Sequence, residues 1–241
     1  MVSPNYKGAV IKIAENYSSL KVENNVFIIS AGVLLNKVAV EACRRGFKGM
    51  EDAFGIPGTI GGAIFMNASA YNFKISDYVV GVLAMVDGKI KEFSKDECEF
   101  GYRTSIFQKI KDVIILEVNL KFNEKGDSAS LLKSTIKVFE KRKEVQPLNA
   151  LTGGSVFKNP EGLFSAKLID ELGLKGHAVG GARVSLKHAN FIENFNNATF
   201  DDVVGLIKHI KTKVFEKYSI DLEVEIKVLG EEDDFWRLPC S

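Results

Sequence analysis

Cysteine and histidine are scarce in this chain of 241 residues, which has three of each. They are Cys43, Cys98 and Cys240, and His177, His188 and His209. The cysteines are odd in number and far apart, so we expect reduced thiols in a cytosolic protein rather than disulfides. No cysteine pair has the spacing of metal ligands and the histidines are scattered, so we expect no metal site.

An excess of charge of one sign is also missing. Lys and Arg number 32 against 31 Asp and Glu, a net charge of +1, which argues against a broad surface for nucleic acid or an anionic membrane. No apolar run approaches the ~20 residues of a membrane span. Residues 1–7 have no apolar core, so no signal peptide is expected. We therefore expect a cytoplasmic protein without nucleic acid or membrane as partner.

The pattern of apolar residues predicts an α+β protein of two domains. A polar stretch at residues 123–128 suggests a boundary near residue 127. Strands are predicted at residues 9–13, 20–23, 26–29, 113–122 and 222–229, with two more in 78–93 around an Asp-Gly turn. Helices are predicted at residues 30–45, 130–144 and 163–172, and a last helix begins after a capping residue, Thr199.

Residues 55–62 form a glycine-rich motif that an apolar run follows directly. Glycine leaves backbone N–H groups open to a ligand, and Thr59 is placed to cap a short helix whose positive end would face the same point. This geometry suits a diphosphate and therefore a nucleotide cofactor. A tight turn between a strand and a buried helix explains the spacing about equally well, because one glycine motif is a weak signal.

Three polar residues lie in apolar or glycine-rich surroundings. Arg103, between aromatic residues, could bind a carboxylate or phosphate with two hydrogen bonds, or could simply cover apolar surface with its stem. Ser155 follows two glycines and could give or relay a proton, or could be an ordinary turn serine. Glu225 lies in an alternating segment whose polar face is either a cleft wall or solvated surface.

Taken in order, these segments resemble UDP-N-acetylenolpyruvoylglucosamine reductases, the MurB family of peptidoglycan synthesis. Residues 55–71 resemble the family's flavin-binding signature, and residues 101–107 match its Gly-Tyr-Arg-x-Ser-x-Phe element. Residues 154–160 match its catalytic serine element, and residues 188–192 and 222–225 also fit. Five ordered motifs cover nearly the whole chain, and the short link between the arginine and serine motifs resembles the compact type of the family.

The resemblance implies a fold and a reaction. The fold is an FAD-binding domain of the vanillyl-alcohol-oxidase (PCMH) type over residues 1–127, followed by an α/β MurB-type substrate domain over residues 128–241. NADPH reduces bound FAD, and the enolpyruvyl ether of UDP-N-acetylglucosamine is then reduced to UDP-N-acetylmuramate for cell wall biogenesis, which supports cell shape and division. A monomer is expected.

The resemblance also assigns roles to residues of this chain. Arg103, and Glu225 if it is protonated or paired with Arg103, would polarise the substrate carboxylate. Ser155 would donate the proton, helped by Lys158 or a water. Substrate contacts are implied for Tyr102, Lys158 and Asn159. The implied FAD-binding residues are Gly55, Ile56, Pro57, Gly58, Thr59, Gly61, Gly62 and Asn67.

The chain also departs from the family pattern. It opens on sequence that resembles the part following the family's N-terminal subdomain, so we expect that subdomain to be absent and FAD to be held weakly or not at all. Ser69 stands where the family prefers glycine. A non-catalytic remnant of the same fold therefore remains an alternative, as does, more weakly, another flavoprotein of the same superfamily such as a sugar or alcohol oxidase.

Overall fold

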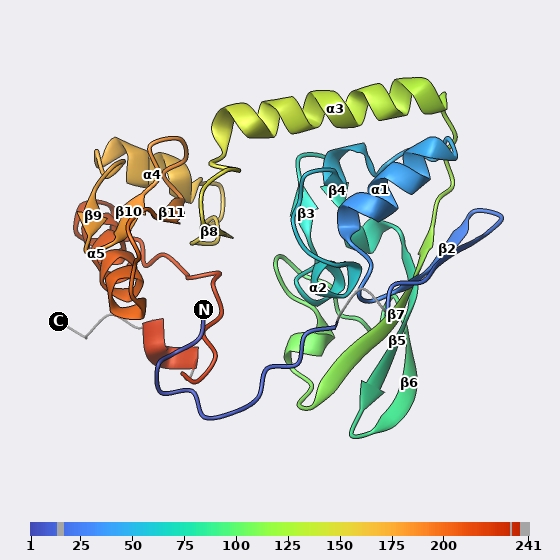
Figure 1. The fold of residues 1–241 in the computed structure, drawn as a ribbon, viewed down its shortest axis with the longest axis horizontal. Helices are drawn as coiled ribbons and strands as arrows, with labels where there is room; N and C mark the ends of the chain where they lie inside the picture. Colours follow the sequence, from blue (N-terminus) through green and yellow to red (C-terminus); the bar gives the residue numbers. More distant parts are fainter. Residues whose placement is uncertain (14–16, 232, 237–241) are drawn as a thin grey trace. The chain divides into compact units, whose positions relative to one another are not determined.

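The computed structural model describes residues 1–13, 17–231 and 233–236 (Figure 1). The chain divides into two compact units. The first is Ile11–Lys141, called the 11–141 unit here, and the second joins Met1–Val10 to Arg142–Ser241 and is called the C-terminal unit. The division falls near the end of α3 (Ser128–Val145), whereas the sequence placed a boundary before this helix, near residue 127.

The 11–141 unit is built on a five-stranded antiparallel sheet with the order β1-β2-β7-β5-β6. Its strands are β1 (Leu20–Glu23), β2 (Val26–Ser30), β5 (Val79–Val86), β6 (Lys89–Ser94) and β7 (Val113–Lys121). Both predicted hairpins are confirmed. Asn24, Asp87 and Gly88 have positive φ angles of 57°, 49° and 74°, as tight hairpin turns require.

Two helices share the core of this sheet, α1 (Leu35–Arg44) and α2 (Ile60–Phe65). The prediction that the first helix begins at Ser30 is wrong. The carbonyl groups of Ala31 and Val33 accept hydrogen bonds from Gly61 and Ile60, residues 31–33 form a turn, and the helix begins only after Leu34. Leu34, expected on the buried face, is consequently exposed.

An aromatic cluster fixes the centre of this unit. The rings of Phe27 and Phe122 meet edge to face with centroids 5.0 Å apart, and Phe47 lies 5.6 Å from Phe27. Two short strands, β3 (Ser69–Ala70) and β4 (Phe73–Lys74), form a small hairpin. Helical turns at Glu51–Ala53, Ile75–Asp77 and Ile106–Gln108 complete the unit, and the last of them lies in the arginine motif.

The strand predicted over residues 9–13 is not formed. Val10 and Ile11 are 63% and 91% exposed. The earlier residues instead pair with the far end of the chain, where the N–H of Ser3 donates to the carbonyl of Leu229 at 2.9 Å. Apolar β-branched residues predict a strand only where a partner edge is available.

The C-terminal unit has a four-stranded antiparallel sheet with the order β8-β11-β10-β9. Its strands are β8 (Thr152–Ser155), β9 (Ala178–Val179), β10 (Ala182–Val184) and β11 (Phe191–Asn194). Helices α4 (Ser165–Glu171) and α5 (Phe200–Tyr218) share its core, and a helical turn follows at Asp233–Trp236. The predicted capping box of α5 is confirmed, because Thr199 and Asp202 bond each other's backbone N–H groups.

The closing strand predicted over residues 222–229 is wrong as a strand but right in its alternation. Leu222 is fully buried and Val224 and Ile226 pack against the core, while Glu223 and Lys227 are exposed. The segment forms only isolated bridges, Phe157 with Val224 and Val2 with Leu229. Its position therefore depends on individual hydrogen bonds rather than on a ladder.

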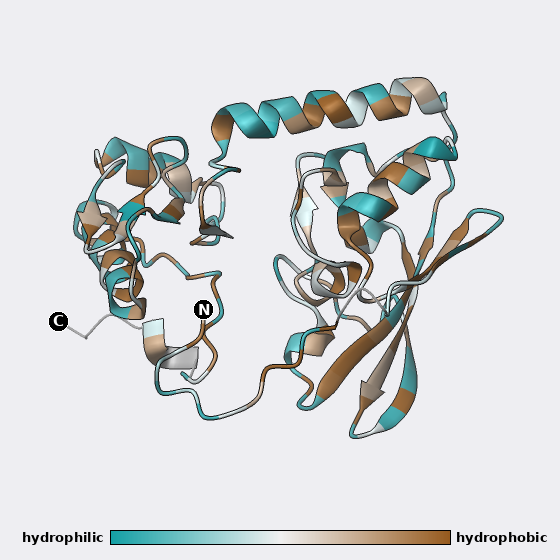
Figure 2. Cartoon of the chain, in the orientation of Figure 1, coloured by the Kyte–Doolittle hydropathy of each residue, from teal (hydrophilic) through white to brown (hydrophobic). Residues whose placement is uncertain are grey.

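The structure also bears on the predictions for the amphipathic helix, the cysteines and membrane spans. Figure 2 shows hydrophilic and hydrophobic residues alternating along α3, as expected for an amphipathic helix. Cys43 and Cys98 are free and buried, and burial raises the pKa of each thiol to about 12. Cys240 lies outside the described residues. Among the helices that the structure describes, none is both long and apolar enough to cross a bilayer.

Candidate active site

The glycine motif is a connector anchored on the segment before α1. The N–H of Gly61 donates to Ala31 and that of Ile60 to Val33, at 3.0 and 2.8 Å. The Gly55 N–H donates to Asn36 Oδ1 at 2.7 Å. Two of the first N–H groups of α2 therefore bond to the protein itself and are not available to a ligand. To that extent the motif is the tight turn before a buried helix that was the alternative to a nucleotide site.

Other glycines of the same motif face open space. Gly58 has a φ of +109°, and a Cβ built on it would meet no atom within 4 Å. A Cβ on Gly62 would meet only Thr59 Oγ1, at 3.8 Å. Pro57, Gly58 and Gly62 are exposed. Thr59 caps α2 as predicted, accepting the Gly62 N–H at 3.4 Å. This exposed edge is where a ligand could approach the backbone.

Asn67 connects the end of α2 to the arginine motif. It is 4% exposed with a φ of +45°, and its Nδ2 donates to the carbonyl of Gly101 at 2.8 Å. Its Oδ1 is buried and accepts no hydrogen bond in the described part of the chain. A buried acceptor without a donor is costly, which makes it a natural contact for a bound ligand with an N–H group.

Arg103 sits on a tight turn beside the small β3–β4 hairpin. The N–H of Gly101 donates to Thr104 at 3.1 Å, and Arg103 has a φ of +56°, rare for a side chain with a Cβ. Its Nη1 donates to Ser69 Oγ at 2.6 Å and its Nη2 to the Ser69 carbonyl at 3.2 Å. The guanidinium lies 5.2 Å from the centroid of the exposed Tyr102 ring. The arginine is thus held by contacts on its own unit, not merely laid over apolar surface.

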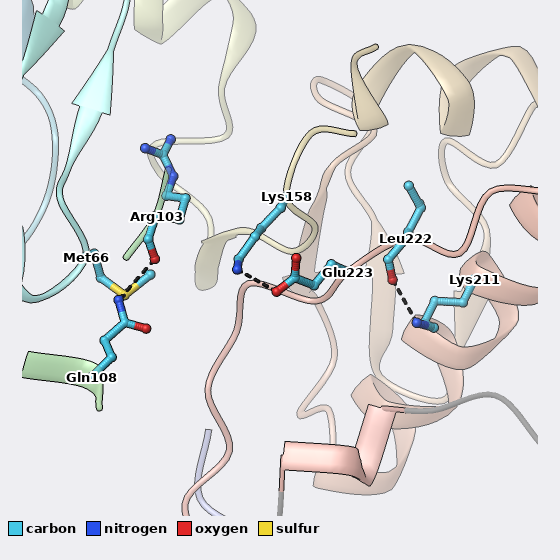
Figure 3. A network of polar contacts seen from close by, with 7 residues as sticks. All are labelled: Met66, Arg103, Gln108, Lys158, Lys211, Leu222 and Glu223. Atoms are coloured by element: carbon cyan, nitrogen blue, oxygen red, sulfur yellow. Dashed lines mark hydrogen bonds and ion pairs between the residues drawn. The ribbon is translucent and has the colours of Figure 1, made fainter. Parts of the chain in front are cut away.

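Gln108 supports this turn and is a residue that the sequence reasoning missed. Its Nε2 donates to the carbonyl of Phe65 at 2.8 Å. It also donates to the carbonyl of Arg103 at 3.0 Å and lies 3.7 Å from Met66 Sδ (Figure 3). Ser105, inside the motif, also donates to Phe65, at 2.8 Å. The place of Gln108 in the sequence, directly after the matched motif of residues 101–107, could have identified it. The end of α2 and the arginine turn therefore form one hydrogen-bonded piece.

Ser155 ends β8 in the C-terminal unit and pairs with Phe191 of β11. The next two residues are fixed by Asn190, whose carbonyl accepts the Val156 N–H at 2.9 Å. The Asn190 side chain bonds the N–H and carbonyl of Phe157 at 2.9 and 2.8 Å. Asn190 is 4% exposed and was recognised in the sequence only as part of a motif. Its hydrogen bonds therefore fix the backbone of the two residues that follow Ser155.

His188 contacts the residues that hold this loop. Its ring lies 4.7 Å from that of Phe191, and its Nδ1 accepts the N–H of Asn190 at 3.3 Å. Burial lowers the pKa of His188, and the charge of Lys175 lowers it further. Both effects favour the neutral ring, which is the form that can accept this hydrogen bond.

Lys158 is bound to the segment that carries Glu225. Its Nζ lies 2.5 Å from Glu223 Oε1, and its N–H donates to the carbonyl of Glu223 at 2.9 Å (Figure 3). The Glu225 N–H donates to Val156 at 2.8 Å. Asn159 is exposed, and its Oδ1 accepts the N–H of Ser165 at the start of α4. Ser155, Lys158, Asn159 and Glu225 thus belong to one hydrogen-bonded region.

The predicted site residues accordingly fall into two groups. The glycine motif, Asn67, Tyr102 and Arg103 belong to the 11–141 unit, and the serine loop with Glu225 belongs to the C-terminal unit. Joint action of the two groups on one ligand stays a prediction. Among the described residues, no group of three or more His, Cys, Asp and Glu could hold a metal ion.

Comparison with known proteins matches both parts of the chain. A family model described as the C-terminal domain of UDP-N-acetylenolpyruvoylglucosamine reductase matches residues 146–229, and an FAD binding domain matches residues 2–94. The reductase of that name from Alkaliphilus oremlandii is 47% identical over 92% of this chain and 73% of its own length. The chain belongs to the UDP-N-acetylenolpyruvoylglucosamine reductase family.

Further relatives agree with this membership. The reductase of Clostridium tetani is 42% identical over 94% of the chain and 73% of its own length. The crystal structure of the reductase from Thermus caldophilus superposes with a TM-score of 0.77 at 34% identity, covering 89% of this chain and 76% of that one. The predicted fold class, an FAD-binding domain with a MurB-type C-terminal domain, is confirmed.

Members of the reductase family are flavin-dependent oxidoreductases that use FAD and NADPH, as predicted. The described residues fit a flavin nucleotide in two respects. The backbone at Gly58 and Gly62 is open where a Cβ would otherwise stand, and the buried Oδ1 of Asn67 needs a donor. Both features are in the 11–141 unit, in the segment predicted to bind the cofactor.

Proposed function

We propose that this chain catalyses the NADPH-dependent, FAD-mediated reduction of the enolpyruvyl ether of UDP-N-acetylglucosamine to UDP-N-acetylmuramate. This reaction would place it in peptidoglycan precursor synthesis, and thereby in cell wall biogenesis, cell shape and division. The observation that carries the proposal is the hydrogen-bonded pairing of the serine loop with the Glu225 segment, in a chain of the reductase family.

The assignment of flavin binding to residues 1–127 and substrate binding to residues 128–241 is part of the proposal. The two family models match on either side of residue 127, which supports it. A cytoplasmic location is also proposed, because the buried thiols of Cys43 and Cys98 are free. A monomer is the proposed state.

The chemistry divides between the cofactor and this chain's own side chains. The bound flavin would supply the hydride to the substrate after NADPH has reduced it. Gly58, Gly62 and Asn67 would hold the cofactor through open backbone and the unpaired Oδ1. Tyr102 and Asn159, both exposed, would contact substrate. The protein's remaining task is to stabilise negative charge next to the substrate carboxylate and to deliver one proton.

Arg103 would stabilise that charge as it develops, since positive charge fixed beforehand lowers the barrier most. Glu225 would assist when protonated or paired with Arg103, because an isolated carboxylate would repel the developing negative charge. Ser155 Oγ would donate its proton to the substrate carbon that carries the carboxylate. Serine is a weak acid, so it needs a relay that restores its proton. Lys158 Nζ is engaged in an ion pair with Glu223, so we favour a water molecule over the lysine as the group that returns a proton to Ser155. Lys158 would then contact the substrate or hold the loop in place.

The two half-reactions give a direct test. We expect the chain with FAD to be reduced by NADPH without oxygen, losing flavin absorbance, and to be reoxidised by the enolpyruvyl substrate. Ser155→Ala should keep reduction but lose reoxidation and product. Ser130→Ala, at an exposed serine of α3, is the matched control and should keep both. Survival of both half-reactions in Ser155→Ala would contradict the proton-donor role. A wild-type chain that binds no FAD would instead favour the non-catalytic alternative.

A further inference from the structure

We propose that Lys211 is a positioning residue for Glu225, which it serves by anchoring the segment that carries this carboxylate. The inference rests on the proposed function, because Glu225 matters only if the chain reduces its substrate. Lys211 lies on α5 and is 3% exposed. A charged amine so deeply buried is unusual unless specific partners hold it.

The partners of Lys211 are at the head of that segment. Its Nζ donates to the carbonyl of Leu222 at 2.7 Å (Figure 3). The same Nζ lies 2.7 Å from Asp221 Oδ1. The side chain of Asp221 is 57% exposed, so solvent screens that ion pair. The Leu222 carbonyl is the buried partner, and this hydrogen bond is therefore the stronger constraint.

The segment needs such an anchor because no ladder holds it. Residues 222–225 touch the serine loop through two backbone bonds, from Lys158 to Glu223 and from Glu225 to Val156. The ion pair between Lys158 and Glu223 is partly exposed, with the Glu223 side chain 69% accessible. Apolar side chains of α5 also pack against Leu222, but packing does not fix the main chain in one register. Among the described residues, Lys211 supplies the one hydrogen bond to this stretch from a buried side chain of a long helix.

The position of Lys211 in the sequence supports the same interpretation. The buried stripe of α5 includes Ile207, Lys211 and Val214, which are four and three residues apart and so share one face of the helix. A lysine that only covered surface would lie on the opposite face. Its amine instead passes through the apolar layer to reach a main-chain carbonyl.

Lys211→Met is the informative change, since methionine keeps an unbranched apolar side chain but cannot donate a hydrogen bond. We expect reoxidation of the reduced flavin by the enolpyruvyl substrate to slow about 10- to 100-fold, because small misplacements of catalytic groups carry costs of that size. Reduction by NADPH should be unchanged. Lys208→Met, on the exposed side of α5, is the matched control and should leave both steps unchanged.

Amide hydrogen exchange provides a readout that does not depend on activity. Loss of the anchor should speed exchange at the Glu225 and Lys158 amides at least tenfold, while the amides of α5 and β11 keep their protection. Asp221→Asn should change little, because the carbonyl bond remains. Lys211→Gln keeps one amide donor and should give a weaker effect; it carries the test if the methionine variant does not fold.

Two results would overturn the proposal. One is unchanged exchange at Glu225 in both Lys211 variants. The other is an equal loss in both half-reactions together with lost protection of α5, which would make Lys211 a stabilising residue only. If the wild-type chain performs no turnover, the proposed function fails, and exchange at Glu225 still decides whether Lys211 is the anchor.

Discussion

Adding one methyl group at Gly61 or at Gly62 should have opposite consequences, although the two glycines are neighbours in α2. A Cβ on Gly61 would lie 2.9 Å from Ala31 Cβ, 3.2 Å from the Ala31 carbonyl oxygen and 3.4 Å from its Cα. A Cβ on Gly62 would have only Thr59 Oγ1 nearby, at 3.8 Å. The pair therefore separates packing from ligand access within a single helix.

The magnitudes follow from these contacts. Alanine is preferred over glycine in a helix by up to about 1 kcal/mol, so Gly62→Ala should leave the free energy of unfolding unchanged or raise it slightly. Gly61→Ala gains the same preference but forces the backbone at Ala31 to move, and such overpacking costs about 1–3 kcal/mol. Because the close contacts include the backbone of Ala31, the cost should lie in the upper part of this range, about 2–3 kcal/mol. Subtracting about 1 kcal/mol of helix preference leaves a net loss of about 1–2 kcal/mol.

Binding of FAD should reverse the order of the two variants. Gly62 is exposed and lies in the predicted cofactor segment, so a methyl group there would stand where the ligand approaches the backbone. Gly61 N–H is already bonded to Ala31, so its methyl group should affect affinity only through stability. Gly62→Ala should therefore weaken FAD binding about tenfold, or 1.4 kcal/mol, while keeping full stability.

Urea unfolding and a titration with FAD followed by flavin fluorescence measure both quantities. The reasoning is refuted if Gly61→Ala is as stable as the wild type, because the close approach to Ala31 would then be unimportant. If Gly62→Ala binds FAD as tightly as the wild type, Gly62 does not contact the cofactor, and the glycine motif serves only as a turn.

Three further results are expected. Arg103→Lys should lower turnover about 100-fold with little change in melting temperature, because a single ammonium group cannot replace the planar guanidinium; near-normal turnover would remove Arg103 from the mechanism. Hydrogen bonds from the Thr199 and Gly181 N–H groups lower the pKa of Asp202. Its contribution to stability is therefore present above the ordinary pKa of about 3.9 and is lost as pH falls through the lowered value. The melting temperature of Asp202→Asn should lack this loss at low pH, and parallel plots of melting temperature against pH for the variant and the wild type would contradict the assignment. In a Cys240→Ser background, Cys43 and Cys98 should react with a thiol reagent only upon unfolding, since burial raises both pKa values to about 12; fast labelling of the native protein would be inconsistent with that burial.

Local patterns in the sequence were sufficient for much of the fold. The Asn-Asn and Asp-Gly pairs predicted two hairpins, because positive φ angles there are favourable for those residues. Thr199 and Asp202 predicted the start of α5 through a capping box that acts within one turn. Such features need no distant partner, which is why they could be predicted.

Segments whose structure depends on a distant partner were predicted less well. Residues 30–34 have a helical pattern, but the carbonyls of Ala31 and Val33 bind the glycine motif instead of the N–H groups of a first helical turn. Residues 222–229 alternate as a strand does, yet they find only isolated bridges. Propensity is a weak preference that tertiary hydrogen bonds outweigh.

The sequence by itself determined the family, the candidate residues and their chemical types, because motif order and spacing survive without coordinates. Only the tertiary structure decided which of these side chains have partners. It showed Arg103 bonded to Ser69, Lys158 bonded to Glu223, and a buried Lys211 beneath the segment of Glu225. The first two contacts join residues 34 and 65 positions apart, and the third joins a helix to the segment after it. Such pairing depends on how the whole core packs rather than on any local pattern.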